Sequence, residues 1–149
     1  MSDEIVRITE RKHIASILAI EDERLTPQVL YLRDITKAEW VQWLENIITR
    51  EDHIRMWGVL KDNKLVYYLV AINAMMPPIS REVLLLYSNF YGSKSDAGEE
   101  YNLMALEKVK EWAKELGALR IQTFTQYPRV MSKFGFQKED AVSVVLQVN

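Results

Sequence analysis

The stretch of sequence that decides the fold is EVLLLYSNFYGSKSDAGEEYNLMALEKVKEWAKELGALRIQTFT, residues 82–125. Its first ten residues, 82–91, form a largely apolar run that predicts a buried strand. Residues 98–116 carry apolar side chains at helical spacing, Gly117 is a good stop for that helix, and residues 118–125 predict a second strand. A strand, a helix and a strand in close succession favour a right-handed crossover between parallel strands.

The loop between this strand and helix, residues 92–102, reads GSKSDAGEEYN. The unpaired N–H groups and the positive dipole end of a helix start attract anions, so a loop in this position can cradle a phosphate. Here, however, Glu99 and Glu100 stand where an anion would dock. Three readings stay open: a plain cap in which Asp96 and Glu99 form a capping box, a rearranged cofactor loop, or a loop that has lost its cofactor.

The rest of the chain supplies further strands and helices on both sides of this stretch. Element order predicts a mixed α/β (α+β) sheet flanked by about four helices, and 149 residues favour a single domain, 1–149. The further strands are expected at 4–9, 54–60, 64–74 and 141–148, and the further helices at 10–24, from Thr36 to about Ile48, and at 128–134.

Two short-range signals sharpen these expectations. Residues 61–63, Lys-Asp-Asn, separate two apolar runs and predict a hairpin turn. Thr36 and Glu39 form a capping box in front of an amphipathic helix. Trp40 and Trp43 lie three apart on that helix, where core packing is the favoured reading and a homodimer face is the alternative.

Composition excludes several classes of function. A net charge of −2 leaves no basic surplus for nucleic acid, and the absence of cysteine rules out disulfides, thiolate metal sites and a cysteine nucleophile. His13 and His53 lack metal-ligand spacing, so no metal is expected. No apolar run approaches the roughly 20 residues of a membrane helix. A reducing, cytoplasmic setting fits this composition.

The element order resembles that of the GNAT superfamily of acyl-CoA-dependent N-acyltransferases. The resemblance spans nearly the whole chain and is most specific from Glu82 to Phe136, through EWAKELGALRI at 111–121 and the pair Gly135-Phe136. It implies that two parallel strands splay apart, that the pantetheine arm of an acyl-CoA lies in the gap, and that its pyrophosphate rests on the helix start. The donor would be acetyl-CoA or another acyl-CoA, and the acceptor an amine on a small molecule or a protein.

The family marks the pyrophosphate turn with Arg or Gln, two residues, Gly, one residue, and then Gly or Ala. That window falls on residues 97–102, where Ala97 replaces the Arg or Gln, Glu100 the Gly, and Asn102 the last small residue. Only the accessory Gly98 is retained. Mapped in this way, the resemblance implies cofactor contacts from Tyr87, Ser88, Asn89, Gly98, Glu99, Glu100, Tyr101 and Asn102.

Amine acylation needs a base for the ammonium proton and an acid for the thiolate leaving group. The family often places the acid, a Tyr, four residues before the glycine of the Gly-Phe pair, but Met131 stands there. Tyr127, one turn earlier, is the candidate acid, and Glu82, at the start of the strand, is the candidate base. A packed tyrosine and a solvated strand end are the alternatives.

Two functions therefore stay open. The first is an N-acetyltransferase that takes its acyl group from acyl-CoA. The second is a catalytically inactive binding or structural module of the same fold that has lost the pyrophosphate site. Fold likeness alone cannot separate them, because function resides in the site.

Overall fold

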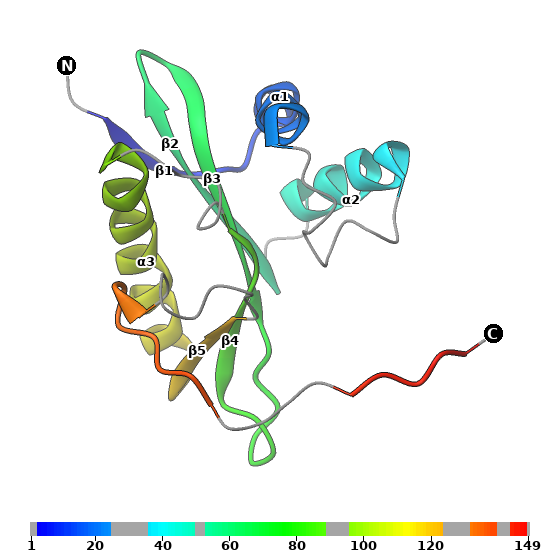
Figure 1. Cartoon of the computed structure of the whole chain (residues 1–149), viewed down its shortest axis with the longest axis vertical. Coiled ribbons are helices and arrows are strands. Elements are labelled where there is room, and N and C mark those ends of the chain that lie inside the picture. Colours follow the sequence, from blue (N-terminus) through cyan, green and yellow to red (C-terminus); the bar gives the residue numbers. More distant parts are fainter. Residues whose placement is uncertain are drawn as a thin grey trace.

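The computed structural model describes residues 3–24, 36–49, 53–88, 96–123, 132–139 and 144–148. Five strands form one sheet in the order β1-β2-β3-β4-β5, and all neighbours are antiparallel except β4 and β5, which are parallel (Figure 1). This confirms the mixed sheet and the parallel pair. The strands are β1 (Glu4–Arg7), β2 (Ile54–Lys61), β3 (Lys64–Asn73), β4 (Glu82–Ser88) and β5 (Arg120–Thr123). The helical elements are the 3₁₀-helix η1 (Arg11–His13) and the α-helices α1 (Ile14–Arg24), α2 (Lys37–Thr49) and α3 (Asp96–Leu116).

The helices lie on both faces of the sheet, α3 on one and α1 with α2 on the other (Figure 1). Each face has its own apolar core, because side chains of a strand alternate between the two faces. Trp57 and Leu69 pack under α3, whereas Met56 and Val70 pack under α1 and α2. In the second core the rings of Trp40 and Trp43 stack with centroids 4.9 Å apart, and Trp40 is buried. The core reading of this pair is confirmed.

The short-range signals formed the predicted structures. The N–H of Thr36 donates to Glu39 Oε1 at 3.1 Å, and the N–H of Glu39 donates to Thr36 Oγ1 at 3.1 Å, which is a capping box. Asp62 and Asn63 have φ values of 53° and 64°, so they make a two-residue turn of the kind whose twist matches a hairpin. Lys61 and Lys64 close that hairpin.

The end of α3 is fixed by Gly117. Its φ of 77° suits glycine, and its N–H donates to the carbonyl of Lys114 at 3.1 Å. The N–H of Ala118 donates to the carbonyl of Ala113 at 2.9 Å, which completes a Schellman motif. The chain then turns directly into β5, as the sequence predicted. The start of α3 differs from the prediction, because the helix begins at Asp96 rather than at about Gly98.

Two expected elements near the C-terminus are only partly covered by the described residues. For the helix predicted at 128–134, residues 128–131 lie outside the described residues, and the described part leads into a turn that ends at Gly135, with φ 92°. The strand predicted at 141–148 is wrong for its described part, because residues 144–148 are exposed and outside the sheet. An apolar, β-branched pattern indicates a strand but does not supply its partner, which depends on contacts far away in the sequence. In the described part of the chain, no helix combines the length and apolar character needed to cross a bilayer.

Candidate functional site

The parallel pairing of β4 with β5 covers only the first part of β4. Residues Glu82–Leu85 pair with Arg120–Thr123, but β4 continues to Ser88. On its other side, β4 stays paired with β3 to the end, through Tyr87 and Ser88. Along the described length of β5, the last three residues of β4 therefore have no partner on that side. The predicted splay of the two strands also involves residues after Thr123, which lie outside the described part of the chain, so it stays a prediction.

A β-bulge lies at the same point of β4. Val70 faces Tyr87, whereas Ala71 faces Leu85, so Leu86 is an extra residue on β4. A bulge bends its strand and increases the local twist, and bulges are frequent beside active sites. The extra residue, Leu86, directly follows Leu85, the last residue of β4 that pairs with the described part of β5.

The start of α3 lies past the carboxyl end of β4. The hydroxyl of Tyr67 donates to Asn102 Oδ1 at 2.7 Å, which fixes the second turn of α3 over β3. Tyr67 lies two residues beyond Leu69, the partner of Ser88, so this turn is past the end of β4. The first four N–H groups of a helix have no partner within the helix and carry its positive dipole end. In α3 they belong to residues 96–99, among them Gly98, the third helical residue.

Tyr101 and Asn102, both predicted to contact a cofactor, have side chains buried against the sheet. The ring centroid of Tyr101 lies 6.0 Å from that of Tyr67, and Asn102 is 1% exposed. Both residues fall on the inner face of α3, one turn before Ala105 and Leu106 of the core. The sequence held a signal for this, since Tyr101, Ala105 and Val109 repeat every four residues.

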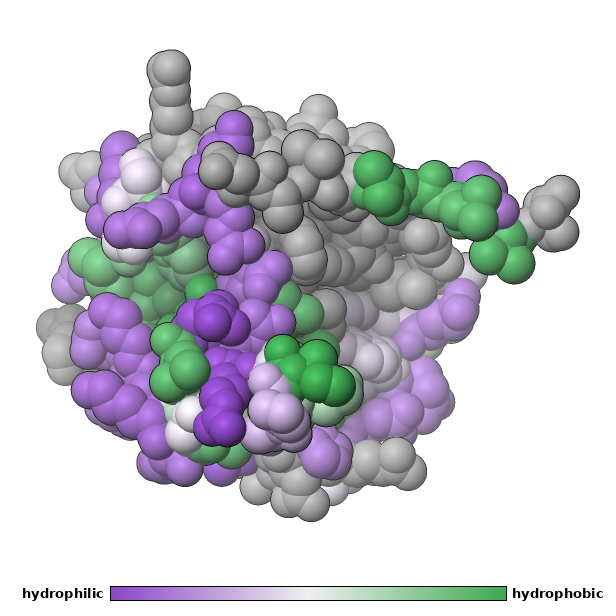
Figure 2. All heavy atoms as spheres, turned by 90° about the horizontal axis from the view of Figure 1, so that it is seen from below, coloured by the Kyte–Doolittle hydropathy of each residue, from purple (hydrophilic) through white to green (hydrophobic). Residues whose placement is uncertain are grey.

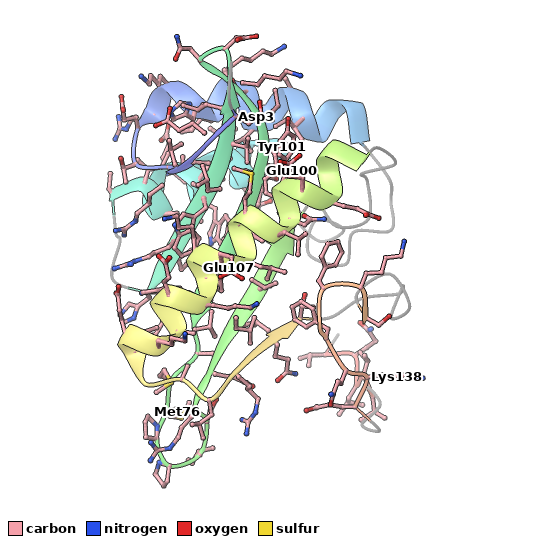
Figure 3. All side chains as sticks on the ribbon, turned by 90° about the vertical axis from the view of Figure 1, so that its left-hand side faces the viewer. Asp3, Met76, Glu100, Tyr101, Glu107 and Lys138 are labelled. Atoms are coloured by element: carbon pink, nitrogen blue, oxygen red, sulfur yellow. The ribbon has the colours of Figure 1, made fainter. Side chains whose placement is uncertain are left out.

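The hydroxyl of Tyr101 is held in its neutral form. Burial raises the pKa of Tyr101 above its ordinary value, and a hydrogen bond with Asp3 and the charges of Asp3 and Glu100 raise it further. Figure 3 shows Asp3, Glu100 and Tyr101 gathered at one end of α3. A phenol in this setting anchors the helix to the N-terminal strand and does not serve as a base near neutral pH.

Glu99 and Glu100 are both exposed on the first turns of α3. Glu99 Oε1 lies 3.4 Å from Lys133 Nζ, and this exposed pair contributes at most about 1 kcal/mol of stability. Lys133 thus brings a positive charge to the start of α3, and this charge partly offsets the negative charge of Glu99. The sequence analysis missed Lys133, because 34 residues separate it from Glu99 and no local pattern links them.

Glu82, the candidate base, lies at the opposite end of β4. Its backbone carbonyl accepts from the N–H of Ala74 at 3.1 Å, and it pairs with Arg120, just after α3 has ended. A helix of 21 residues is about 31 Å long, so α3 separates Glu82 from the helix start by most of that length. The structure does not bring Glu82 together with the start of α3.

The remaining candidate residues are placed as follows. Tyr87 and Ser88 lie in β4, on the segment that has no partner in the described part of β5. Tyr127, the candidate acid, and Asn89 lie outside the described residues, so their roles stay predictions. Within the described ranges, no group of three or more His, Cys, Asp and Glu side chains is arranged to hold a metal ion.

Several solved structures are similar to this protein in fold. No protein-family model and no curated protein matches the sequence. Among solved structures, a predicted acetyltransferase from Clostridium acetobutylicum with acetyl-CoA is similar at a TM-score of 0.71 and 16% identity, over 99% of this chain and 96% of that one. The aminoglycoside N-acetyltransferase AAC(6')-Iy, in complex with a bisubstrate analogue containing CoA, is similar at a TM-score of 0.70 and 12% identity, over 100% of each chain.

A third similar structure is a ribosomal-protein-alanine N-acetyltransferase from Brucella melitensis, with a TM-score of 0.65 and 11% identity, over 99% of this chain and 100% of that one. At sequence identities this low, structural similarity shows the fold alone, and the chemistry has to be argued from the residues of the site. These similarities extend over nearly the full chain, and they indicate the same fold as the described strands with their parallel β4–β5 pair. The chain has the fold of the GNAT acetyltransferases.

Proposed function

We propose that this protein is an N-acyltransferase that moves an acyl group from an acyl-CoA, acetyl-CoA in the first instance, to an amine. One observation carries the proposal: past a bulge, the end of β4 has no partner in the described part of β5, and a helix start lies just past that end. Exposed strand backbone and unpaired helix N–H groups are the two features that bind an amide-containing arm and an anionic pyrophosphate. In this protein the exposed backbone at the end of β4 comes first, and the N–H groups at the start of α3 lie just beyond it.

The residues of this chain fit an acyl-CoA at both of these places. The backbone of residues 86–88, on the edge facing away from β3, would hydrogen bond with the amides of the pantetheine arm. The N–H groups of residues 96–99 would hold the pyrophosphate, with Lys133 as a nearby cation. A bound acyl-CoA supplies an activated thioester, from which the acyl group passes to an uncharged amine as the carbon–sulfur bond breaks.

The protein would contribute mainly by positioning. Holding donor and acceptor together turns a bimolecular step into an effectively unimolecular one, which can lower the barrier by about 7–11 kcal/mol. Tyr127 is proposed as the acid that returns a proton to the thiolate. Glu82 is kept as a candidate base, although it is distant from the start of α3.

The acceptor is proposed as an amine on a small molecule or a protein. The similar solved structures include an aminoglycoside acetyltransferase and a ribosomal-protein-alanine acetyltransferase, which covers both kinds of amine. A sequence without cysteine is suited to the reducing cytoplasm, where we expect the reaction to take place.

One observation favours the second function, a binding module that has lost its cofactor. Glu99 and Glu100 place two carboxylates on the first turns of α3, and a pyrophosphate would be repelled by both. The ion pair with Lys133 reduces this repulsion for Glu99. For Glu100 no such pair occurs among the described residues, and this residue separates the two functions most sharply.

Thermal unfolding with acetyl-CoA and with free CoA tests the proposal. A ligand at 100 times its dissociation constant adds about 2.7 kcal/mol to the free energy of unfolding, which raises the midpoint by several degrees. We expect this rise with both compounds and a smaller one with pantetheine, which lacks the pyrophosphate. Release of free thiol from acetyl-CoA in the presence of a panel of amines then measures transfer. An unchanged midpoint at millimolar CoA would refute the proposal.

A further inference from the structure

Asn102 is a polar side chain in the apolar core between α3 and the sheet. It is 1% exposed, and among the residues whose side chains the structure describes, no other non-aromatic polar or charged side chain is buried. Its Oδ1 accepts a hydrogen bond of 2.7 Å from the hydroxyl of Tyr67, a β3 residue that is 0% exposed. Burying an amide is costly unless it is hydrogen-bonded, so the bond to Tyr67 offsets the cost of placing Asn102 there.

Stability alone does not explain this buried pair. A hydrogen bond inside a protein replaces bonds to water, so its net contribution is small, and an apolar pair of the same shape can fill a core about as well. A hydrogen bond adds direction, however, whereas apolar contacts are non-directional. The GNAT pattern has Gly or Ala at the position of Asn102, so the bond is a feature of this chain.

The residue before Asn102 is anchored as well. The ring centroid of Tyr101 lies 6.0 Å from that of Tyr67, and the Tyr101 hydroxyl hydrogen bonds with Asp3, which precedes β1. Figure 3 shows Asp3 and Tyr101 close together at this end of α3. Successive side chains of an α-helix point about 100° apart, so anchors at two successive residues oppose both rotation of the helix and sliding along its axis.

The other end of α3 is fixed in a different way. It lies toward the lower end of the molecule in Figure 1, which Figure 2 shows from below, and hydrophilic side chains cover much of the coloured surface there. The N–H groups of Gly117 and Ala118 donate to carbonyls of the last turns, so the backbone itself closes that end. The first N–H groups of a helix have no preceding carbonyl, so the place of the first turn is set by contacts with the sheet.

We propose that Asn102, held by Tyr67, is a positioning residue that sets where the first turn of α3 lies relative to the end of β4. This inference rests on the proposed function. The N–H groups of residues 96–99 precede Asn102 by three to six residues, or roughly 4.5–9 Å along the helix axis. A shift at Asn102 therefore moves these groups together, and a misplacement of about 1 Å can lower a rate by about 10².

Two variants, Tyr67→Phe and Tyr67→Phe combined with Asn102→Leu, test this role. The N–H groups of residues 100–103 bond to the carbonyls of 96–99, so their hydrogen exchange in the free protein reports whether the first turn is in place. We expect exchange there to become about tenfold faster or more in both variants, while the double variant keeps the native unfolding midpoint. Calorimetric titration should show a dissociation constant for CoA that is higher by about tenfold or more.

The matched control is Tyr68→Phe. Tyr68 is also 0% exposed, but it lies in the core under α1 and α2, so its change should leave both measurements unchanged. Asn102→Ala restores the small residue of the family pattern, and we expect it to weaken CoA binding because the bond to Tyr67 is lost.

The outcomes separate this inference from the proposed function. Native exchange rates at residues 100–103 in both variants, or an equal response of Tyr68→Phe, would overturn the positioning role. Native CoA binding by the double variant or by Asn102→Ala would overturn the link to the cofactor and leave the proposed function standing. If the native protein itself binds no CoA, the proposed function fails and this inference fails with it.

Discussion

At the starts of both α2 and α3, the first backbone N–H groups have no partner within the helix, and different side chains lie near them. In α2, Thr36 and Glu39 cap the free N–H groups reciprocally, with two hydrogen bonds of 3.1 Å. In α3, the third helical position, where α2 has Glu39, holds Gly98, and the next residue, Glu99, lies near Lys133 instead. A helix start closed by its own side chains serves the fold, whereas N–H groups left free at a helix start can bind an anion.

A capping box of Asp96 and Glu99, one predicted role of the loop before α3, would require Asp96 to precede the helix, but Asp96 is already helical. The cap at α2 is observed, whereas an anion site at the start of α3 stays a proposal. Four predictions test this difference between the two helix starts.

The largest effect is expected from Gly98→Pro. Proline is tolerated in the first turn of a helix but removes an N–H donor, so the stabilisation by saturating CoA, about 2.7 kcal/mol, should be lost. Thermal unfolding with and without CoA measures it, and circular dichroism checks that α3 is intact. Gly98→Ala keeps the N–H and is the matched control. Equal CoA binding by the two variants would show that this amide takes no part.

At α2, Thr36→Ala should lower the free energy of unfolding by about 1 kcal/mol, because it removes the acceptor for the Glu39 N–H. Thr36→Ser keeps a hydroxyl and should retain most of that stability. Urea unfolding measures both variants. Neither variant should alter CoA binding. A loss of CoA binding in Thr36→Ala would contradict the purely structural role of the α2 cap.

Neutralising the acids at α3 should strengthen CoA binding. A charge near a helix start is worth about 0.3–1 kcal/mol, so Glu100→Gln should tighten CoA by roughly 2–5-fold. Glu99→Gln should have a smaller effect, because Lys133 already offsets its charge. Calorimetric titration measures both, with Glu107→Gln, an exposed mid-helix change, as the control. Weaker CoA binding in Glu100→Gln would mean that this side chain does not oppose the cofactor.

The smallest effect is a pH dependence confined to α2. Hydrogen bonds from Thr36 lower the pKa of Glu39 below its ordinary value of 4.5. Because the folded pKa is the lower one, the stability from this carboxylate is present above pH 4.5 and is lost as pH falls through the folded pKa. The difference in unfolding free energy between the native protein and Glu39→Gln should therefore shrink under acid. A difference that is constant from neutral to acid pH would contradict the role of the charge.

The sequence predicted those parts of the fold that local interactions determine. Thr36 with Glu39, Asp62 with Asn63, and Gly117 each act within a few residues of their own position, so their patterns were sufficient. The parallel pair was also predicted, because a short strand–helix–strand connection has few alternatives.

The candidate site could be predicted less fully from the sequence, because it depends on contacts between residues that are distant in sequence. The placement of Lys133 beside Glu99 and the hydrogen bond from Tyr67 to Asn102 join residues more than 30 positions apart. Tyr101 and Asn102 were expected at a cofactor, but their side chains are buried between α3 and the sheet. Residues 144–148 show the same limit, since their strand pattern carried no information about a partner.

Hydrogen exchange of the backbone amides, with and without saturating acetyl-CoA, shows whether the cofactor binds at β4 and at the start of α3. We predict that acetyl-CoA slows exchange at residues 86–88 of β4 and 96–99 of α3, and leaves the start of α2 unchanged. Protection at both segments would place the ligand along the edge of β4 and against the helix start. Unchanged exchange at both, or protection confined to other parts of the chain, would contradict the proposed binding site.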